Sequence, residues 1–553
     1  MSAATHERSH TIETLVETPS SPTSYSHDGP NSSQERVIPP EHPYRTLVLC
    51  FDGTGDQFDS DVCIRCKSYR NHSDTKIVDI QNSNIVEFFK LLKKDDRSKQ
   101  MVYYQAGIGT YTTPQIATPL MARISKALDE AVAWNLDAHV MDGYEFLMQN
   151  YTAGDRICIF GFSRGAYTAR SLAGMIHKVG ILPACNHQQV PFAYKMFTRA
   201  DEVGWEQSNA FKKAFSIDAD IEFIGVWDTV NSVGLIPKRL PFTTSNNIVR
   251  TFRHAVSLDE RRAKFKANLW NRPTDREGKL GLAHKDHHHA PGQHCDEPIN
   301  EEALNAATQK SGRRANKLLT LERRFSKDRS LVTDIEEVWF AGCHCDVGGG
   351  SVSNDTKPNL ARIPLRWMIR ECFKTNTGIM FDADLIEELG MDPNCLYPEV
   401  LPRPPALPIN PAAHYIQDIP TSSTMSQAHK DMALQNYSTG DVTTVSTSNR
   451  RQTEEELELA DALSPIYDQL SLKWFWWLLE LFPIRMRYQR GDNSWARYFG
   501  WNMGRGRFIP KQKTRGVKVH RSVKMRMEAV HESSRTRYVP KAKFDERYTT
   551  WVD

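Results

Sequence analysis

Short apolar runs alternate with longer segments of helical periodicity over much of the chain. The runs are four to seven residues long and comprise Thr46–Phe51, Met101–Gln105, Ile157–Phe160, Ile221–Trp227 and Glu337–Ala341. Continuous runs of this length are typical of strands buried on both faces of a parallel sheet. Helical periodicity appears around Ile124–Tyr151 and Ile363–Phe373. The pattern predicts an α/β fold with a mainly parallel sheet, helices on both faces, and insertions.

A candidate nucleophile follows the run Ile157–Phe160, in Gly161-Phe162-Ser163-Arg164-Gly165. Small and apolar residues recur at helical spacing after it, so the serine lies where a strand turns into a helix. This arrangement is typical of the nucleophile elbow of α/β-hydrolases, in which the turn lifts the hydroxyl above the sheet. The alternative is an ordinary strand-to-helix connection with a solvated serine, because a five-residue motif can occur by chance.

A base and an acid for Ser163 follow in the order expected of α/β-hydrolases. Asp228 comes directly after the run Ile221–Trp227, and His344 comes shortly after Glu337–Ala341. Parallel strands gather their functional residues at their C-terminal ends, so the three side chains are expected to meet there. Taken singly, Asp228 could cap a turn and His344 could bond a backbone carbonyl. Their shared placement favours a Ser163/Asp228/His344 triad.

The loop after Thr46–Phe51 is a candidate for half of an oxyanion hole. Gly53 and Thr54 can present backbone N–H groups there, and the N–H of Arg164 is expected to supply the other half. A tight polar turn is the alternative for this loop. Asp52 and Asp346 can flank the site as supporting acceptors, or either can be a competing triad acid.

Five motifs together resemble the α/β-hydrolase family typified by type VI secretion phospholipase effectors. They begin at Phe51-Asp52-Gly53-Thr54-Gly55 and Tyr104-Gln105-Ala106-Gly107-Ile108-Gly109, continue with the elbow and Val226-Trp227-Asp228-Thr229-Val230, and end at Gly342-Cys343-His344-Cys345-Asp346-Val347-Gly348-Gly349. The resemblance covers roughly residues 45–370 and implies a Ser-Asp-His hydrolase fold and phospholipid acyl-ester cleavage. The chain departs from the family pattern at one point, because residues Asp59 to Asn82 are inserted between the Asp-Gly-Thr loop and Asn84-Ile85-Val86.

The patterns divide the chain into four predicted parts. Residues 1–43 are polar and predict a disordered arm without the apolar core of a secretory signal. Residues 44–400 are the expected α/β-hydrolase-like catalytic domain, with a flexible insertion at about 273–330. Residues 401–460 are a Pro/Ser/Thr-rich linker or insertion. Residues 461–553 form an aromatic and basic segment expected to pack on the catalytic domain.

Composition limits the partners. The 553 residues carry a net charge of +3, which excludes a global polyelectrolyte partner, and cysteines inside apolar runs favour a reducing, cytoplasmic location. The His-rich tract His284–Cys295 and the pair Cys63/Cys66 lack the spacing of a structural metal site, so no metal or organic cofactor is expected. No nucleic-acid motif is present.

The C-terminal segment leaves two interpretations open. Aromatic residues near Trp474–Leu479 precede 485–524, which has 12 Lys or Arg and one acid, Asp492. Such a mixture over 472–524 suits peripheral contact with an anionic membrane, or else tryptophans packed on the hydrolase core with basic residues facing water. The sequence thus predicts a serine hydrolase of lipid or small carboxylic esters. A catalytically inactive binding or scaffolding module is the alternative.

Overall fold

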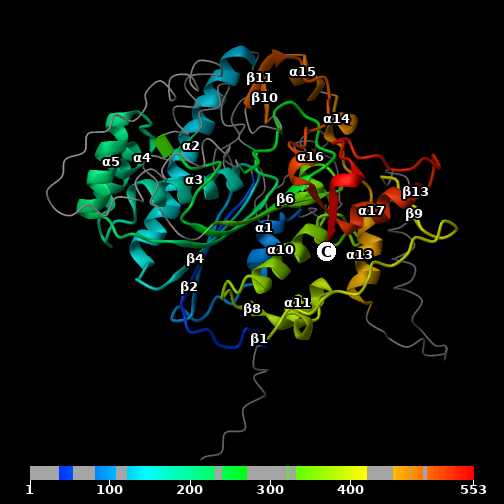
Figure 1. Cartoon of the computed structure of the whole chain (residues 1–553), viewed down its shortest axis with the longest axis horizontal. Helices are drawn as coiled ribbons and strands as arrows, with labels where there is room; N and C mark the ends of the chain where they lie inside the picture. Colours follow the sequence, from blue (N-terminus) through cyan, green and yellow to red (C-terminus); the bar gives the residue numbers. More distant parts are fainter. Residues whose placement is uncertain are drawn as a thin grey trace, which may run out of the picture. The chain divides into compact units, whose positions relative to one another are not determined.

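Eight parallel strands form the sheet that organises the fold in the computed structural model (Figure 1). The described residues are 36–53, 81–107, 121–230, 240–270, 321–322, 332–419, 452–474, 476–481, 483–489 and 495–553. The strand order is β14-β12-β7-β6-β5-β4-β2-β3, and every neighbouring pair is parallel. The strands are β2 (Thr46–Phe51), β3 (Gln100–Gln105), β4 (Arg156–Phe162), β5 (Ile221–Trp227), β6 (Val249–Ser257), β7 (Asp334–Phe340), β12 (Val517–His520) and β14 (Thr549–Val552).

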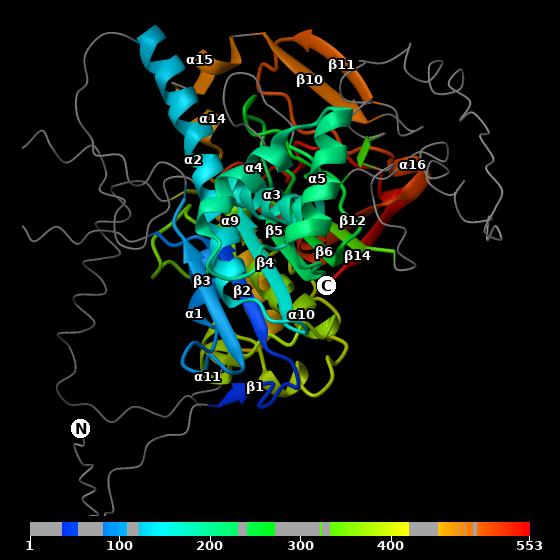
Figure 2. The same cartoon turned by 90° about the vertical axis from the view of Figure 1, so that its left-hand side faces the viewer.

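Helices cover both faces of this sheet because its strands are apolar on both sides. In β2, Leu47 and Leu49 point into one core, whereas Val48 and Cys50 point into the other, as the two-residue period of a strand requires. Helices α2 to α5 cover the first face (Figure 2), and α1 and α10 cover the second, with α13 and α17 beyond them. Their bounds are α1 (Asn84–Lys90), α2 (Met121–Asn150), α3 (Ser163–Val179), α4 (Val190–Thr198), α5 (Glu202–Phe215), α10 (Arg362–Lys374), α13 (Glu454–Ala462) and α17 (Arg521–Glu528).

The remaining described elements are short. Four further strands form the pairs β1–β8 and β9–β13, and β10–β11 is an antiparallel hairpin. Their bounds are β1 (Val37–Ile38), β8 (Phe381–Asp382), β9 (Tyr415–Ile416), β13 (Val530–His531), β10 (Ile484–Gln489) and β11 (Trp495–Gly500). The short helices are α9 (His344–Gly348), α11 (Ala383–Leu389), α14 (Gln469–Leu472), α15 (Trp476–Glu480) and α16 (Gln512–Arg515), with 3-10 turns η2 (His187–Gln189), η4 (Pro393–Cys395) and η5 (Glu546–Tyr548).

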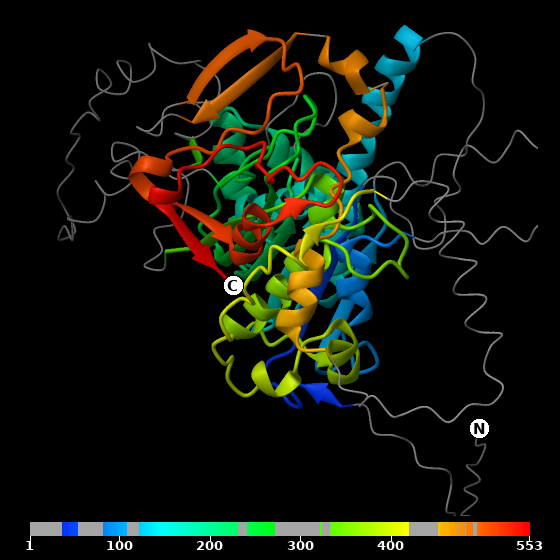
Figure 3. The same cartoon turned by 90° about the vertical axis from the view of Figure 1, so that its right-hand side faces the viewer.

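The C-terminal segment is part of the sheet. Strand β12 pairs with β7, and β14 pairs with β12, so residues 461–553 contribute two strands in addition to packing on the domain (Figure 3, orange to red). The sheet therefore extends beyond the 44–400 region in which the sequence predicts it. Five short helical or extended elements of the same segment, α14, α15, β10, β11 and α16, precede these strands along the chain.

The predicted α/β architecture is confirmed, and all five predicted strands are present. The sequence did not predict β6, because Arg253 and His254 interrupt its apolar pattern. Both side chains are buried with carboxylate partners, since Arg253 Nε lies 2.7 Å from Glu371 and His254 Nδ1 lies 3.0 Å from Glu337. Nearly all of the predicted arm at 1–43 and of the insertion at 273–330 lies outside the described residues. None of the described helices combines the length and apolar character that crossing a bilayer requires.

Candidate active site

Ser163 lies on a strained turn between β4 and α3. Its φ is 59°, in the left-handed region that L-residues with side chains seldom occupy. The preceding strand is buried and pairs with β2 and β5, so the turn lies at the carboxyl end of the sheet's interior strands. Strain of this kind persists only where neighbouring structure fixes the backbone, and it is the geometry of a nucleophile elbow.

The glycines on either side of Ser163 are required by close packing. A Cβ on Gly161 would lie 2.6 Å from the Cα of Ala166, and one on Gly165 would lie 2.3 Å from the carbonyl oxygens of Phe51 and Asp52. Both distances are far inside van der Waals contact. The start of α3 therefore packs directly on the end of β2, which explains the glycine spacing around the serine.

Asp228 is buried at the end of β5 and also has a positive φ, 41°. Its Oδ1 accepts a hydrogen bond from the backbone N–H of Ser257 at 2.9 Å. The side chain of Arg507 donates to both carboxylate oxygens, and the Nη2–Oδ2 distance is 2.8 Å. The carboxylate is thus held from two sides, with Oδ2 also facing His344.

His344 connects Asp228 to Ser163. It is the first residue of α9, directly beyond β7, where its Nδ1 lies 2.5 Å from Asp228 Oδ2 and its Nε2 lies 2.8 Å from Ser163 Oγ. The aromatic rings of Phe162 and Phe265 contact the imidazole, with ring centroids 4.7 and 4.9 Å away. The three predicted side chains therefore form one continuous chain of hydrogen bonds.

The electrostatics of this chain suit proton transfer from the serine. Burial lowers the pKa of His344 below its usual range, against the opposing effect of the Asp228 carboxylate. Burial alone would raise the pKa of Asp228, but the positive charge of Arg507 and the contact with His344 bring it below its usual value. An ionised Asp228 accepts from Nδ1–H, which leaves Nε2 of a neutral imidazole to accept the Ser163 proton.

The sequence did not indicate two residues that complete the site, Arg507 and Glu260. Arg507 is buried, and beyond Asp228 it donates to the carbonyls of Ser257 and Phe265. Glu260 accepts from the backbone N–H of His344 at 3.3 Å. Arg507 belongs to the basic stretch 485–524, but its neighbours in the sequence do not indicate that it pairs with Asp228, 279 positions away.

The expected oxyanion donors have different surroundings. Arg164 follows Ser163 at the start of α3, where a backbone N–H has no carbonyl four residues earlier in the helix to bond. The N–H of Gly53, in contrast, donates to Asp52 Oδ1 at 2.6 Å. Thr54 lies outside the described residues.

Asp52 has partners other than His344. Its carboxylate accepts from Ser83 Oγ at 2.6 Å and from Tyr104 Oη at 2.8 Å. Burial raises its pKa to about 6, although these hydrogen bonds act in the opposite direction. Asp52 thus ties the loop after β2 to α1 and β3.

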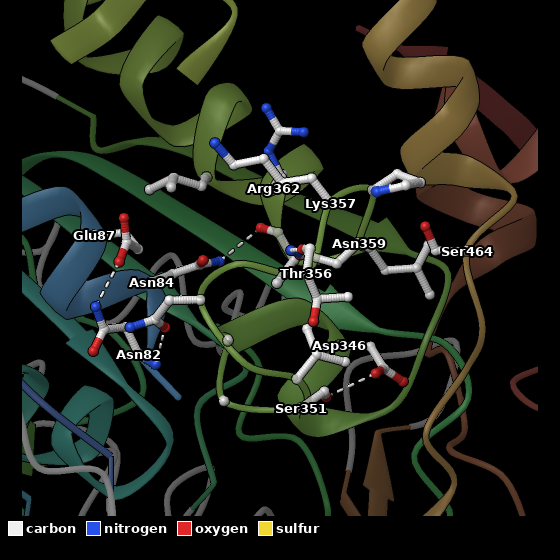
Figure 4. A pocket seen from close by; sticks show the side chains of 18 of the residues that line it. Asn82, Asn84, Glu87, Asp346, Ser351, Thr356, Lys357, Asn359, Arg362 and Ser464 are labelled. Atoms are coloured by element: carbon white, nitrogen blue, oxygen red, sulfur yellow. Dashed lines mark hydrogen bonds between the residues drawn. The ribbon is translucent and has the colours of Figure 1, made fainter. Parts of the chain in front are cut away.

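Asp346 supports the segment that carries His344. It accepts from the backbone N–H groups of Cys343 and Tyr467, at 2.8 and 3.0 Å, and from Ser351 Oγ at 2.8 Å. Burial raises its pKa to about 6. Asp346 also lines a pocket of about 240 Å³ beside α1 and the start of α10 (Figure 4). Ser163 and His344 are not among the described residues that line this pocket.

Metal ligands do not gather within the described part of the chain, where no group of three or more His, Cys, Asp or Glu side chains is placed to hold an ion. The His-rich tract His284–Cys295 and the Cys63/Cys66 pair lie outside that part.

Comparison with known proteins places this site in a family. The chain is 28% identical over 570 aligned positions to the uncharacterized protein YEL023C of Saccharomyces cerevisiae, which covers 88% of this chain and 79% of the yeast protein. Two solved structures match 64% of the chain. One is a crystal structure of an uncharacterized protein from Pseudomonas aeruginosa, with 17% identity and a TM-score of 0.31. The other is the Tle1 effector bound to the VgrG spike from the Type 6 secretion system, with 14% identity and a TM-score of 0.30.

These matches differ in how much of each protein they cover. The aligned region spans about half of the Pseudomonas protein, 48%, and 78% of the Tle1 effector chain. The profile described as "T6SS, Phospholipase effector Tle1-like, catalytic domain" matches residues 45–371, which include Ser163, Asp228 and His344 but end before Arg507. More than half of the chain is matched, and the chain therefore belongs to the Tle1-like phospholipase effector catalytic-domain family.

Proposed function

We propose that the protein is a serine hydrolase that cleaves acyl esters of lipids through Ser163, His344 and Asp228. The observation that carries the proposal is the hydrogen-bonded chain from Ser163 Oγ through His344 to Asp228, which begins on a serine held at a positive φ. A serine hydroxyl needs an adjacent base to attack an ester, and the base needs an acid that fixes its tautomer.

This geometry supports the following reaction. Ser163 Oγ attacks the acyl carbon while its proton passes to His344 Nε2, and we expect the Arg164 N–H to stabilise the oxyanion. His344 then returns the proton to the leaving alcohol, which breaks the ester C–O bond and leaves an acyl-serine. Water, deprotonated by His344, then attacks the acyl-serine. His344 returns this proton to Ser163 Oγ as the bond between Oγ and the acyl carbon breaks, which releases the carboxylic acid and regenerates Ser163.

A lipid substrate is supported by family membership and by the surface of the C-terminal segment. The family description names phospholipase effectors. Large apolar side chains are exposed over part of 472–508, which we call the C-terminal apolar surface; they are Leu472, Trp474, Trp477, Leu478, Leu479, Leu481, Phe499, Trp501, Met503 and Phe508. Trp474 and Phe499 are 75% and 69% exposed. Exposed aromatic and aliphatic side chains of this kind suit a membrane interface.

The C-terminal segment reaches the proposed triad through Trp476. Phe265 contacts the imidazole of His344 on one side and the ring of Trp476 on the other, with ring centroids 4.9 and 5.6 Å apart. Not every basic residue of the segment is available to a membrane, because Arg507 pairs with Asp228 and Lys518 pairs with Glu336. We therefore assign the peripheral contact mainly to the aromatic side chains.

The hydrolase proposal is tested with phospholipid vesicles. Ser163→Ala should lower the rate of fatty-acid release by about 10⁶-fold, because removal of the nucleophile removes the covalent route. Ser171→Ala is the matched control, since it deletes a buried hydroxyl of the same helix that donates to the backbone carbonyl of Tyr167. Equal rates for wild type and Ser163→Ala would reject the proposal.

The membrane contact is tested by co-sedimentation with vesicles of phosphatidylserine and phosphatidylcholine. Replacing Trp474 and Phe499 with Asp should reduce the pelleted fraction, because it places charge on the C-terminal apolar surface. Val203→Asp with Phe215→Asp is the control, since these residues are exposed on α5. Equal pelleting of both double variants and wild type would contradict contact through 472–524.

A binding module without turnover is the second candidate function. The observation that favours it is the N–H of Gly53, which is bonded to Asp52 rather than directed to an oxyanion. Wild-type protein that binds lipid vesicles but releases no acid would support this alternative.

A further inference from the structure

We propose that Arg507 is a positioning residue for the triad acid, supplied by the C-terminal segment and required to fix the carboxylate of Asp228 against His344. The proposal rests on the proposed function, because it concerns the same three side chains. It goes beyond the family match, which ends at residue 371.

Arg507 is built into the site by every nitrogen of its guanidinium. Nη1 and Nη2 both donate to Asp228, and Nη2 lies 2.8 Å from Oδ2. Nη1 also donates to Ser257 Oγ at 2.7 Å, and Nε and Nη2 donate to the carbonyl of Phe265, at 3.1 and 2.6 Å. The planar fork of an arginine matches the two oxygens of a carboxylate, so this pairing fixes orientation as well as charge.

Asp228 needs such a partner because its backbone conformation is strained and its charged carboxylate is buried. It has no exposed surface and a φ of 41°, and an isolated buried carboxylate is costly. Among the described residues, its other carboxylate contacts are one backbone N–H, from Ser257, and the imidazole of His344. Arg507 is therefore the residue that neutralises the carboxylate and holds its plane toward His344 Nδ1.

Charged or titratable groups near this pair include Glu260, Arg262, His254 and Lys266, and Lys266 donates to the backbone carbonyl of Arg505 at 3.2 Å. Glu260 and Arg262 pair with each other at 2.8 Å. His254 lies behind the turn, where its Nε2 accepts from the backbone N–H of Thr229 and its Nδ1 faces Glu337. Removal of Arg507 would leave the Asp228–His344 pair with one buried positive charge fewer. The pair would then bind a proton more readily, whichever of the two residues carries it.

The test compares full-length wild type with Arg507→Met, Arg507→Lys and Arg366→Met. The last is the matched control, because Arg366 forms a buried pair with Asp461, at 2.8 Å, in α10 and α13. Two readouts are followed against pH. One is the titration of His344 by NMR with ¹³C-labelled histidine, assigned with His344→Gln, and the other is the rate of labelling of Ser163 by a fluorophosphonate.

Arg507→Met should raise the titration midpoint of His344 by about one pH unit. It should also slow labelling on the high-pH plateau by about 10²-fold, since the acid loses its orientation. Arg507→Lys should keep the midpoint near that of wild type, because the charge remains, but should slow labelling because the fork is lost. Arg366→Met should move neither.

An unchanged midpoint in folded Arg507→Met would overturn the proposal, and so would wild-type labelling by Arg507→Lys if Arg507→Met does not fold. The NMR readout does not need turnover. If the wild type is not labelled but the midpoint moves, the proposed function fails while the role of Arg507 in orienting and neutralising Asp228 stands.

Discussion

The elbow and the C-terminal segment reach the same site by different routes. Ser163 is held by contacts made within β4 and α3 and by the neighbouring end of β2. The end of β2 lies so close to Gly165 that position 165 has no space for a side chain. Arg507 is held by tertiary contacts alone, with Asp228, Ser257 and Phe265. The nucleophile is thus specified by local sequence, whereas the surroundings of the acid depend on a segment that the family match does not cover.

The difference between these regions has a physical basis. A strained turn needs particular residues at fixed spacing, because only glycine tolerates the close backbone approach on either side of the serine. A buried ion pair needs only that two side chains meet, and the meeting point depends on how β12 and β14 extend the sheet. Motif recognition therefore finds the first kind of residue and misses the second.

Asp228→Asn tests the junction of the two regions and has a larger expected effect than Gly165→Ala or Asp52→Asn. It should lower the rate of ester cleavage by about 10⁴-fold, since an amide no longer fixes the imidazole tautomer. It should also reduce the free energy of unfolding by about 3–5 kcal/mol, because Arg507 remains buried without an anion. Steady-state kinetics and urea unfolding measure the two effects. Loss of activity without loss of stability would show that the pairing of Asp228 with Arg507 does not stabilise the fold.

Gly165→Ala tests the local specification of the elbow. The new Cβ would lie 2.3 Å from two carbonyl oxygens of β2 and its following residue, so unfolding free energy should fall by about 3 kcal/mol. Gly154→Ala is the control, because its Cβ meets nothing within 4 Å and its cost is limited to the strain of a φ of 101°, about 1 kcal/mol. Urea unfolding of both variants measures the difference, and equal losses would show that crowding at the elbow is unimportant.

Asp52→Asn tests the loop beside the elbow through the pH dependence of stability. Burial raises the pKa of Asp52 to about 6 in the folded state, above the ordinary value of 3.8. The folded state then binds more protons between these values, so wild type loses about 2 kcal/mol from this group as pH rises from 4 to 7. The variant lacks this loss. Its unfolding free energy relative to wild type should therefore be more favourable at pH 7 than at pH 4, and parallel pH profiles would contradict the shift.

The sequence predicted the parts of the fold that carry an unbroken apolar pattern. Strands β2 and β5 have the predicted bounds, and Ser163, Asp228 and His344 meet as their order at strand ends indicates. Strand β6 was missed because its buried charges are compensated only by distant partners, such as Glu371 for Arg253. Strand β12 was missed because four residues carry too little pattern. Arg507 was assigned to a basic surface, since its burial depends on the assembled sheet.

The reactivity of Ser163 toward a fluorophosphonate is the most direct test of the central claim. Intact-mass spectrometry and peptide mapping of wild type should show one adduct, on Ser163, and Ser163→Ala and His344→Ala should show none above background. Wild-type protein that remains unlabelled at any pH, or Ser163→Ala labelled as fast as wild type, would contradict a hydrolase that acts through this serine.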